Sequence, residues 1–304
     1  MTERMPSYGG QAVIEGVMMR GARAVAMAVR APSGKIELHT ELLSGIYTSP
    51  ISHIPFLRGL ILLWDSLGLG MRFLTLSANT QTGEEEKIEG PGMYLTMGLS
   101  LVIAVLVFFL APAAVGQLAE RWLGINAWWS NLTEGIIRFA LMIGYIWAVG
   151  QLPDIRRVFA FHGAEHKTIN AYEAGEELTP QTVARYSVEH PRCGTAFLLT
   201  LIVLSIILFT LLGPLPAFWR LTSRILLLPV IAGLAYEFIR WTSRHLNSRL
   251  VRAIVRPNLA LQHLTTREPS LDMIEVAIKA FDAMLALETQ QTVETVLESV
   301  DTTA

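Results

Sequence analysis

The chain has 304 residues, of which 52% are hydrophobic and only 16% are charged. This balance, together with a positive mean hydropathy, is unusual for a soluble domain and indicates an integral membrane protein. A formal net charge of −2 without a basic block argues against nucleic-acid binding, and a single cysteine, Cys193, excludes an internal disulfide.

Residues 1–50 predict a cytoplasmic N-terminal region without an apolar signal peptide. Its glycine-rich stretch, Gly9–Gly21, predicts tight turns in which glycines adopt positive φ. If this backbone instead approaches a ligand, Glu15 and Arg20 are the polar groups beside it; the stretch lacks the pattern of a P-loop. Two strands, Ala24–Arg30 and Lys35–Leu43, are expected to follow as a β-hairpin.

Residues 51–80 are apolar but interrupted by charges. Arg58, Asp65 and Arg72 are seven residues apart and so fall on one stripe of a helix. Because a charge in the middle of a bilayer is costly, we expect an interfacial or re-entrant helix here. A crossing at this segment is the alternative, and it would invert the topology.

Four later segments have the length and apolar character of membrane spans. Two fall in residues 91–152 and two in residues 194–240, and a span needs about 20 apolar residues. The second and fourth carry one charged residue each, and we expect Arg138 to be neutralised by Glu134. The expected spans are Met93–Leu110, Ile136–Leu152, Phe197–Leu212 and Ile225–Ile239.

The distribution of arginine and lysine predicts the orientation of these spans. Basic residues gather in the loop of residues 153–193 and directly after the fourth span, which places both on the cytoplasmic side. Both termini are then cytoplasmic. Residues 241–288 predict a cytoplasmic C-terminal region with an amphipathic helix at Ser270–Leu287, and residues 289–304 a flexible tail.

The sequence therefore predicts an α-helical polytopic membrane protein. It has about four transmembrane helices, an interfacial helix and a small cytoplasmic α+β portion that contains the N-terminal β-hairpin.

The segment His162-Gly-Ala-Glu-His166 carries the strongest chemical signal. It falls in an expected helix, Pro153–Glu173, where histidines four residues apart lie one turn apart and can share a divalent metal, most plausibly zinc. The order His-x-x-Glu-His is the inverted form of a zinc-peptidase motif, in which Glu165 is the general base.

A catalytic zinc needs a third protein ligand, and His190 and Cys193 are the leading candidates. Glu173 and Glu237 are carboxylate alternatives, although Glu237 is also placed to pair with a nearby arginine. Three ligands predict a hydrolase that acts on a peptide, amide or ester at the membrane surface. Four ligands would close the site and predict a structural metal in a non-catalytic assembly protein, and transport is a third, weaker reading.

Four motifs in order resemble the YqhQ-like family of bacterial membrane proteins. The resemblance covers roughly Gly9 to Ile278 and implies a bacterial inner-membrane protein with a metal site at His162, Glu165 and His166. The family's function is unknown, although it is labelled a predicted metal-dependent enzyme. We expect the bilayer as its surroundings and a membrane protein or lipid as substrate. The motifs are Gly9–Arg20, Phe161–Thr168, His190–Thr195 and Leu264–Pro269.

Overall fold

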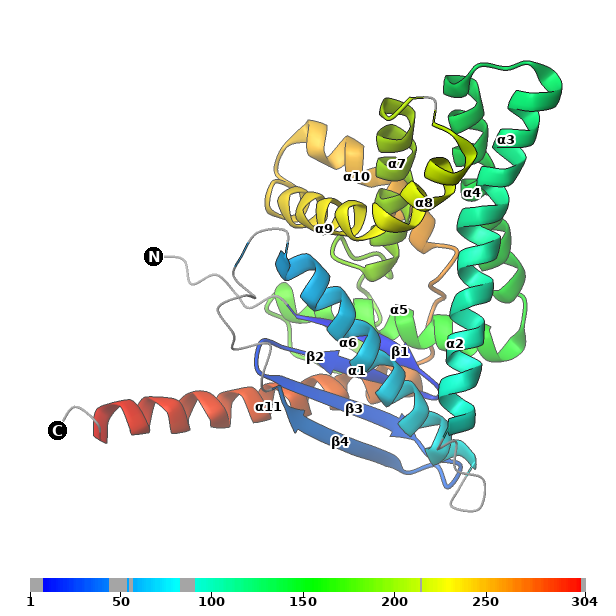
Figure 1. The fold of residues 1–304 in the computed structure, drawn as a ribbon. Coiled ribbons are helices and arrows are strands. Elements are labelled where there is room, and N and C mark those ends of the chain that lie inside the picture. Colours follow the sequence, from blue (N-terminus) through cyan, green and yellow to red (C-terminus); the bar gives the residue numbers. More distant parts are fainter. Residues whose placement is uncertain (1–7, 44–53, 55–56, 83–90, 214, 302–304) are drawn as a thin grey trace.

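The structure is a computed structural model that describes residues 8–43, 54, 57–82, 91–213 and 215–301. The predicted N-terminal region, the segment 51–80 and the predicted tail therefore lie partly outside the described residues. The chain forms a bundle of helices and a small β-sheet, and a long helix, α5 (Pro153–Glu173), lies between them (Figure 1). This mostly helical architecture agrees with the predicted fold class.

The N-terminal region is a four-stranded antiparallel sheet of order β1-β2-β3-β4. The predicted hairpin is confirmed as β3 (Ala24–Arg30) paired with β4 (Ile36–Leu42). The glycine-rich stretch forms two further strands, β1 (Gly9–Val13) and β2 (Gly16–Arg20), rather than a series of tight turns.

The prediction of positive φ at these glycines is wrong. The residue with positive φ in the β1–β2 turn is Glu15, at 53°. The glycines serve close packing instead, because a Cβ on Gly16 would overlap the carbonyl oxygen of Ala28 and one on Gly10 would lie 2.5 Å from that of Met18. A missing side chain, not a special backbone angle, is what these positions require.

The two faces of the sheet are covered by different helices. In β3 the alanines Ala24, Ala26 and Ala28 face a core shared with α5 and with α11 (Leu271–Asp301), whereas the larger Val25, Met27 and Val29 face the other core. That second core contains Phe73 of α1 (Leu57–Thr82). The period of two along the strand thus leaves small side chains where α11 packs closely.

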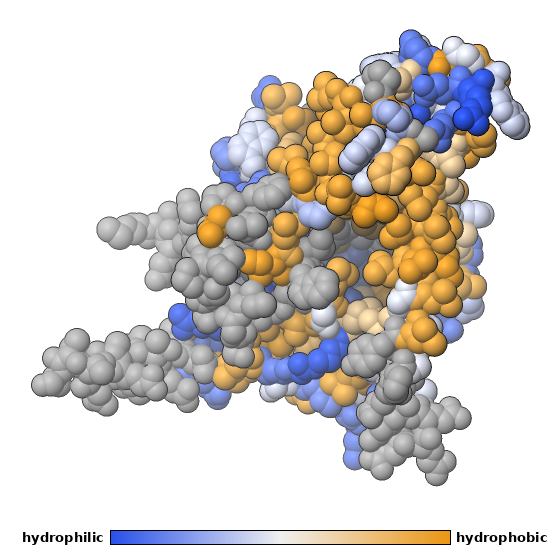
Figure 2. Space-filling model, in the orientation of Figure 1, coloured by the Kyte–Doolittle hydropathy of each residue, from blue (hydrophilic) through white to orange (hydrophobic). Residues whose placement is uncertain are grey.

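Three stretches are long and apolar enough to cross a membrane. The first, Leu95–Leu123, runs through α2 (Pro91–Val105), a π-helical segment η4 (Leu106–Leu110) and α3 (Ala111–Leu123). The others are α4 (Ala127–Val149) and α7 (Gly194–Leu211). Hydrophobic residues cover this part of the surface, whereas hydrophilic residues gather at the α3–α4 connection and around the sheet (Figure 2).

The predicted boundaries of these spans shift, and the first continues past Leu110 to Leu123. The second begins at Ala127 rather than Ile136, so Glu134 lies inside it. The fourth predicted span corresponds to a bent pair of helices, α8 (Ala217–Leu226) and α9 (Leu228–Arg244), with an angle of 42° between them. Among the described residues, α1 is not one of the helices that are long and apolar enough to cross a membrane, and it packs on the sheet and on α9.

Charged side chains are buried inside the bundle. The predicted pair is confirmed, because Arg138 donates to Glu134 at 2.8 Å. The same carboxylate also accepts from Arg224 of α8 at 2.7 and 2.8 Å, and all three side chains are almost completely buried. Arg224 further lies over the ring of Phe209, 4.1 Å from its centroid. The network ties the bent pair to α4 and α7.

The remaining helices are α6 (Pro180–Val183), α10 (Arg249–Gln262) and α11. The short helix α6 follows α5, and α10 packs against α7. The predicted amphipathic helix begins at Leu271 as expected, but α11 continues past Leu287 to Asp301.

Candidate metal centre

Helix α5 supplies the two histidines of the motif. Pro153 fits its first turn, where no backbone donor is needed, and Gly175 lies beyond its end with a φ of 78°. The small side chains of Ala160 and Ala164 face the core shared with the sheet. The opposite face carries His162 and His166 toward the segment that leads into α7.

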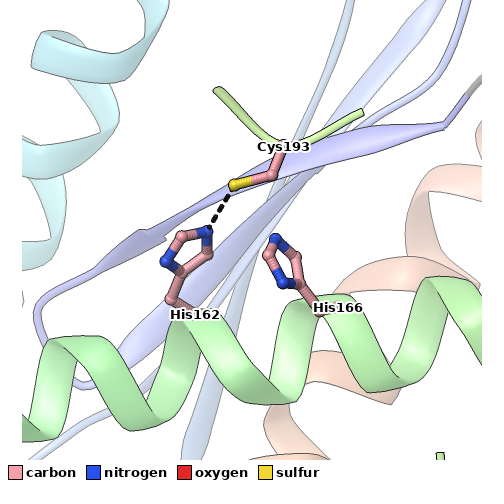
Figure 3. Close-up of side chains that lie close together, drawn as sticks. All are labelled: His162, His166 and Cys193. Carbon is pink, nitrogen blue, oxygen red and sulfur yellow. Dashed lines mark hydrogen bonds between the residues drawn. The ribbon is translucent and has the colours of Figure 1, made fainter. Parts of the chain in front are cut away.

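Three ligand groups from two segments converge here. One atom of each of His162, His166 and Cys193 lies within 4.8 Å of the other two. The Sγ of Cys193 is 3.3 Å from Nε2 of His162, and the two imidazole centroids are 4.4 Å apart. Both rings point from α5 toward the thiol (Figure 3). Cys193 and His166 are buried, and His162 is partly exposed.

Backbone carbonyls fix the tautomer of both rings. Nδ1 of His162 lies 2.9 Å from the oxygen of Thr265, and Nδ1 of His166 lies 2.5 Å from that of Val188. A carbonyl only accepts, so each Nδ1 carries the proton, and Nε2 of a neutral ring then presents a lone pair. Nε2 of His166 is buried without a hydrogen-bond partner in the described structure. That is an unsatisfied acceptor aimed at the thiol side of the site.

The Thr265 carbonyl reaches α5 because residue 163 is glycine. A Cβ at Gly163 would overlap the carbonyl oxygen of Arg267, and the backbone N–H of Arg267 donates to the oxygen of Phe159 at 2.9 Å. The segment after α10 therefore lies directly along α5. Sequence reasoning did not identify Thr265 or Val188, since any residue supplies a carbonyl and no side-chain pattern marks it.

Lys167 holds in place the segment that carries the Val188 carbonyl. Its buried ammonium donates to the oxygens of Ala184 and Tyr186 at 2.8 and 2.7 Å and pairs with Glu268 at 2.6 Å. One charge thus joins α5 to the segments on both sides of the histidines. Its position next to His166 was the only available sequence signal for this role.

Cys193 is the N-cap of α7. Its Sγ accepts from the backbone N–H of Thr195, and the Cys193 N–H donates to the oxygen of His190 in the preceding turn. The thiolate is the form that binds metals.

Glu165 points toward the sheet. The backbone N–H of Gly10 donates to its carboxylate, and a Cβ on Gly10 would lie 3.0 Å from its Cδ. Burial raises the pKa of Glu165 from 4.5 to about 7, although His162 and the Gly10 N–H act to lower it. Its Oε2 is buried without a partner among the described residues. Glu165 does not belong to the group of converging ligand atoms.

His190 lies beside the group and not in it. Its ring centroid is 5.7 Å from that of His166, and its Nε2 is 3.8 Å from a carboxylate oxygen of Glu173. Burial lowers the pKa of His190. Glu173 also pairs with Arg192, and although burial opposes it, His190 and Arg192 together lower the pKa of Glu173.

The other predicted site residues are not brought to this group. Glu15 forms a two-point ion pair with Arg157, with distances of 2.5 and 2.6 Å. Arg20 ends β2, and Glu237 lies on α9. None of these three belongs to the cluster of His162, His166 and Cys193.

The donor set fits a divalent metal. Zinc–nitrogen distances near 2.0 Å and zinc–sulfur distances near 2.3 Å imply that a nitrogen and a sulfur on one tetrahedral zinc lie about 3.5 Å apart. The 3.3 Å between Nε2 of His162 and Sγ of Cys193 is close to this spacing. The hydrogen bonds from both Nδ1 atoms to carbonyls are the outer contacts typical of metal-binding histidines.

Comparisons with known proteins agree on a family. Residues 54–287 match the family described as "Protein of unknown function (DUF1385)". The chain is 33% identical over 303 residues to "Uncharacterized protein YqhQ" of Bacillus subtilis (strain 168), with 93% of each chain covered. No solved structure matches it significantly. The chain therefore belongs to the DUF1385 family of proteins of unknown function, together with YqhQ.

Proposed function

We propose that the protein is a membrane-embedded, metal-dependent hydrolase. His162, His166 and Cys193 would hold one divalent ion, with zinc fitting the donor set best, and would leave a fourth position open for water. The observation that carries the proposal is the buried, unpartnered Nε2 of His166, which faces a second imidazole nitrogen and a thiol. Leaving such an acceptor without a partner is costly unless a ligand satisfies it.

The residues around this centre support hydrolysis of a peptide, amide or ester. A bound divalent ion supplies Lewis acidity and lowers the pKa of a coordinated water. Glu165, with a pKa of about 7, could exchange a proton near neutral pH, but its carboxylate faces the Gly10 backbone and would have to turn toward the ion to act as the general base. The carbonyls of Thr265 and Val188 keep both rings in the orientation that this arrangement requires.

The topology supports a location on the cytoplasmic side of the inner membrane. The sheet precedes all candidate spans and α11 follows them, yet the two pack together and so lie on the same side. The number of crossings between them is therefore even, which three single spans cannot satisfy. If the bent pair α8–α9 is the fourth span, both termini and α5 share one side, and the arginines and lysine there identify it as cytoplasmic.

Metal analysis of the purified chain tests the proposal. We expect about one divalent ion per wild-type chain, and at least tenfold weaker metal binding in His166→Ala and Cys193→Ser, because each loses a ligand. His245→Ala is the matched control, since this exposed histidine directly after α9 contacts the carbonyl and ring of Trp241 and is not part of the cluster. Equal metal content in all four proteins would contradict the site.

A structural metal site is the second candidate, because His190 lies next to His166 and would close the coordination sphere if it turned inward. Cobalt-substituted protein separates the two. An open position predicts that a hydroxamate changes the visible absorption of the cobalt ion in wild type and in His190→Ala. A closed site predicts no change in wild type, and a change only after His190 is removed.

A further inference from the structure

A cleft lies beside the segment whose Val188 carbonyl contacts Nδ1 of His166. It has a volume of about 490 Å³ and is open to the surface. One wall is the segment leading into α7 and the other is formed by the α9–α10 connection and α10. Its lining residues are Asn170, Tyr186, Ser187, Glu189, Pro191, Leu246, Arg252 and Leu259.

The charge of this cleft comes from α10. Arg249, Arg252 and Arg256 are exposed on this helix, and no acidic residue occurs within it. Among the described residues, none of the three forms an ion pair. The opposite face of α10 buries Val251 and Val255 against α7, so the arginines are held outward.

The one carboxylate in the lining already has a partner. Glu189 lies 2.7 Å from Nε2 of His263. Near it, the Ser187 hydroxyl accepts from the Glu189 N–H and keeps its own hydrogen available as a donor. The polar part of the cleft is therefore suited to an anion.

The rest of the cleft is apolar and lies at the end of a span. Leu246, Leu259 and Pro191 line it, and Leu259 lies on the same face of α10 as Arg252. Asn258 of α10 reaches Thr200, six residues into α7. A ligand here would meet positive charge and apolar surface together at the boundary of the bilayer.

We propose that this cleft binds the headgroup of an anionic phospholipid. The phosphate would pair with Arg252, with Arg249 and Arg256 adding to the field, and the upper acyl chains would lie along Leu246 and Leu259. Basic residues at a membrane surface attract anionic lipid in this way, at about 1 kcal/mol per residue, or roughly fivefold in affinity. The proposal does not depend on a metal in the neighbouring centre.

Thermal unfolding of the full chain in neutral detergent tests the site. Phosphatidylglycerol should raise the melting temperature of wild type more than phosphatidylcholine with the same acyl chains. Arg252→Gln should weaken the apparent affinity for phosphatidylglycerol roughly fivefold. The triple variant Arg249→Gln, Arg252→Gln and Arg256→Gln should abolish the difference between the two lipids.

The controls distinguish a loss of lipid binding from a loss of folding, and a lipid ligand from a free phosphate. The variants should match wild type without lipid, because the three side chains are exposed, and native mass spectrometry should count fewer bound anionic lipids on them. Arg23→Gln, an exposed arginine beside the sheet, should behave as wild type. Equal stabilisation by both lipids, full binding by the triple variant, or an equal effect of glycerol phosphate alone would each overturn the proposal.

Discussion

The carboxylate of Glu165 is buried between the Gly10 backbone and α5, the helix on which Glu165 and both histidines lie. Burial raises its pKa to about 7, so it is largely protonated in mildly acidic solution. The unfolded chain releases this proton near pH 4.5, and the folded chain therefore binds more protons between these two values.

The sign of the resulting pH dependence follows directly. In protein freed of metal by a chelator, the contribution of Glu165 to stability is complete below pH 4.5 and is lost as the pH rises to about 7. The loss is roughly 3 kcal/mol. Glu165→Gln should remove this pH-dependent loss, so the unfolding free energy of the variant should exceed that of wild type by a growing amount as the pH rises across this range. Identical pH profiles for the two proteins would show that the carboxylate is not buried as described.

The three converging groups illustrate what a local pattern can reveal. The helical spacing of His162 and His166 already placed both rings on one face. The choice between His190 and Cys193 depended on a turn, because the Cys193 N–H bonds to the His190 carbonyl and the two side chains then diverge. Cys193 reaches the histidines, and His190 reaches Glu173.

At the scale of elements, the contact between α5 and the segment after α10 depends on the absence of a side chain at Gly163. In Gly163→Ala the new Cβ overlaps the Arg267 carbonyl, so we expect a loss of about 1–3 kcal/mol. The Thr265 carbonyl would move with it, and metal affinity should fall about 10–100-fold. Gly194→Ala is the control, since a Cβ there meets nothing within 4 Å. Equal effects of both changes on metal affinity would contradict this account.

Lys167 joins three segments through one buried ammonium. Lys167→Met keeps most of the volume but leaves the Ala184 and Tyr186 carbonyls without their donor, which should cost about 2–4 kcal/mol. Glu268→Gln should cost less than about 1 kcal/mol, because the Glu268 side chain is 70% exposed and its pairing is screened. Chemical denaturation of both variants measures which change costs more stability, and a larger loss for Glu268→Gln than for Lys167→Met would contradict this account.

At the scale of the whole molecule, Glu134 connects the bent pair to the rest of the bundle. Glu134→Gln removes the carboxylate that three buried arginines share, Arg138, Arg220 and Arg224, and should cost about 3–5 kcal/mol. The matched change is Glu120→Gln, whose side chain is 37% exposed and pairs only with Arg220; we expect less than about 1 kcal/mol there. Unfolding in detergent compares the two. A small effect at Glu134 would mean that packing alone holds α8.

The sequence by itself determined the features that depend on neighbours along the chain. Long apolar runs indicated the membrane helices, a period of two indicated β3 and β4, and one helical turn placed His162 over His166. Each of these follows from local geometry, in which nearby residues decide the outcome.

Only the tertiary structure decided which distant groups meet. It turned the glycine-rich stretch into two strands that pack close to their neighbours, bent the fourth span, selected Cys193, and brought the carbonyls of Thr265 and Val188 to the imidazoles. Such contacts join residues 22 to 103 positions apart, and some use backbone atoms that every residue has. No local pattern records them, because they result from how complete elements pack.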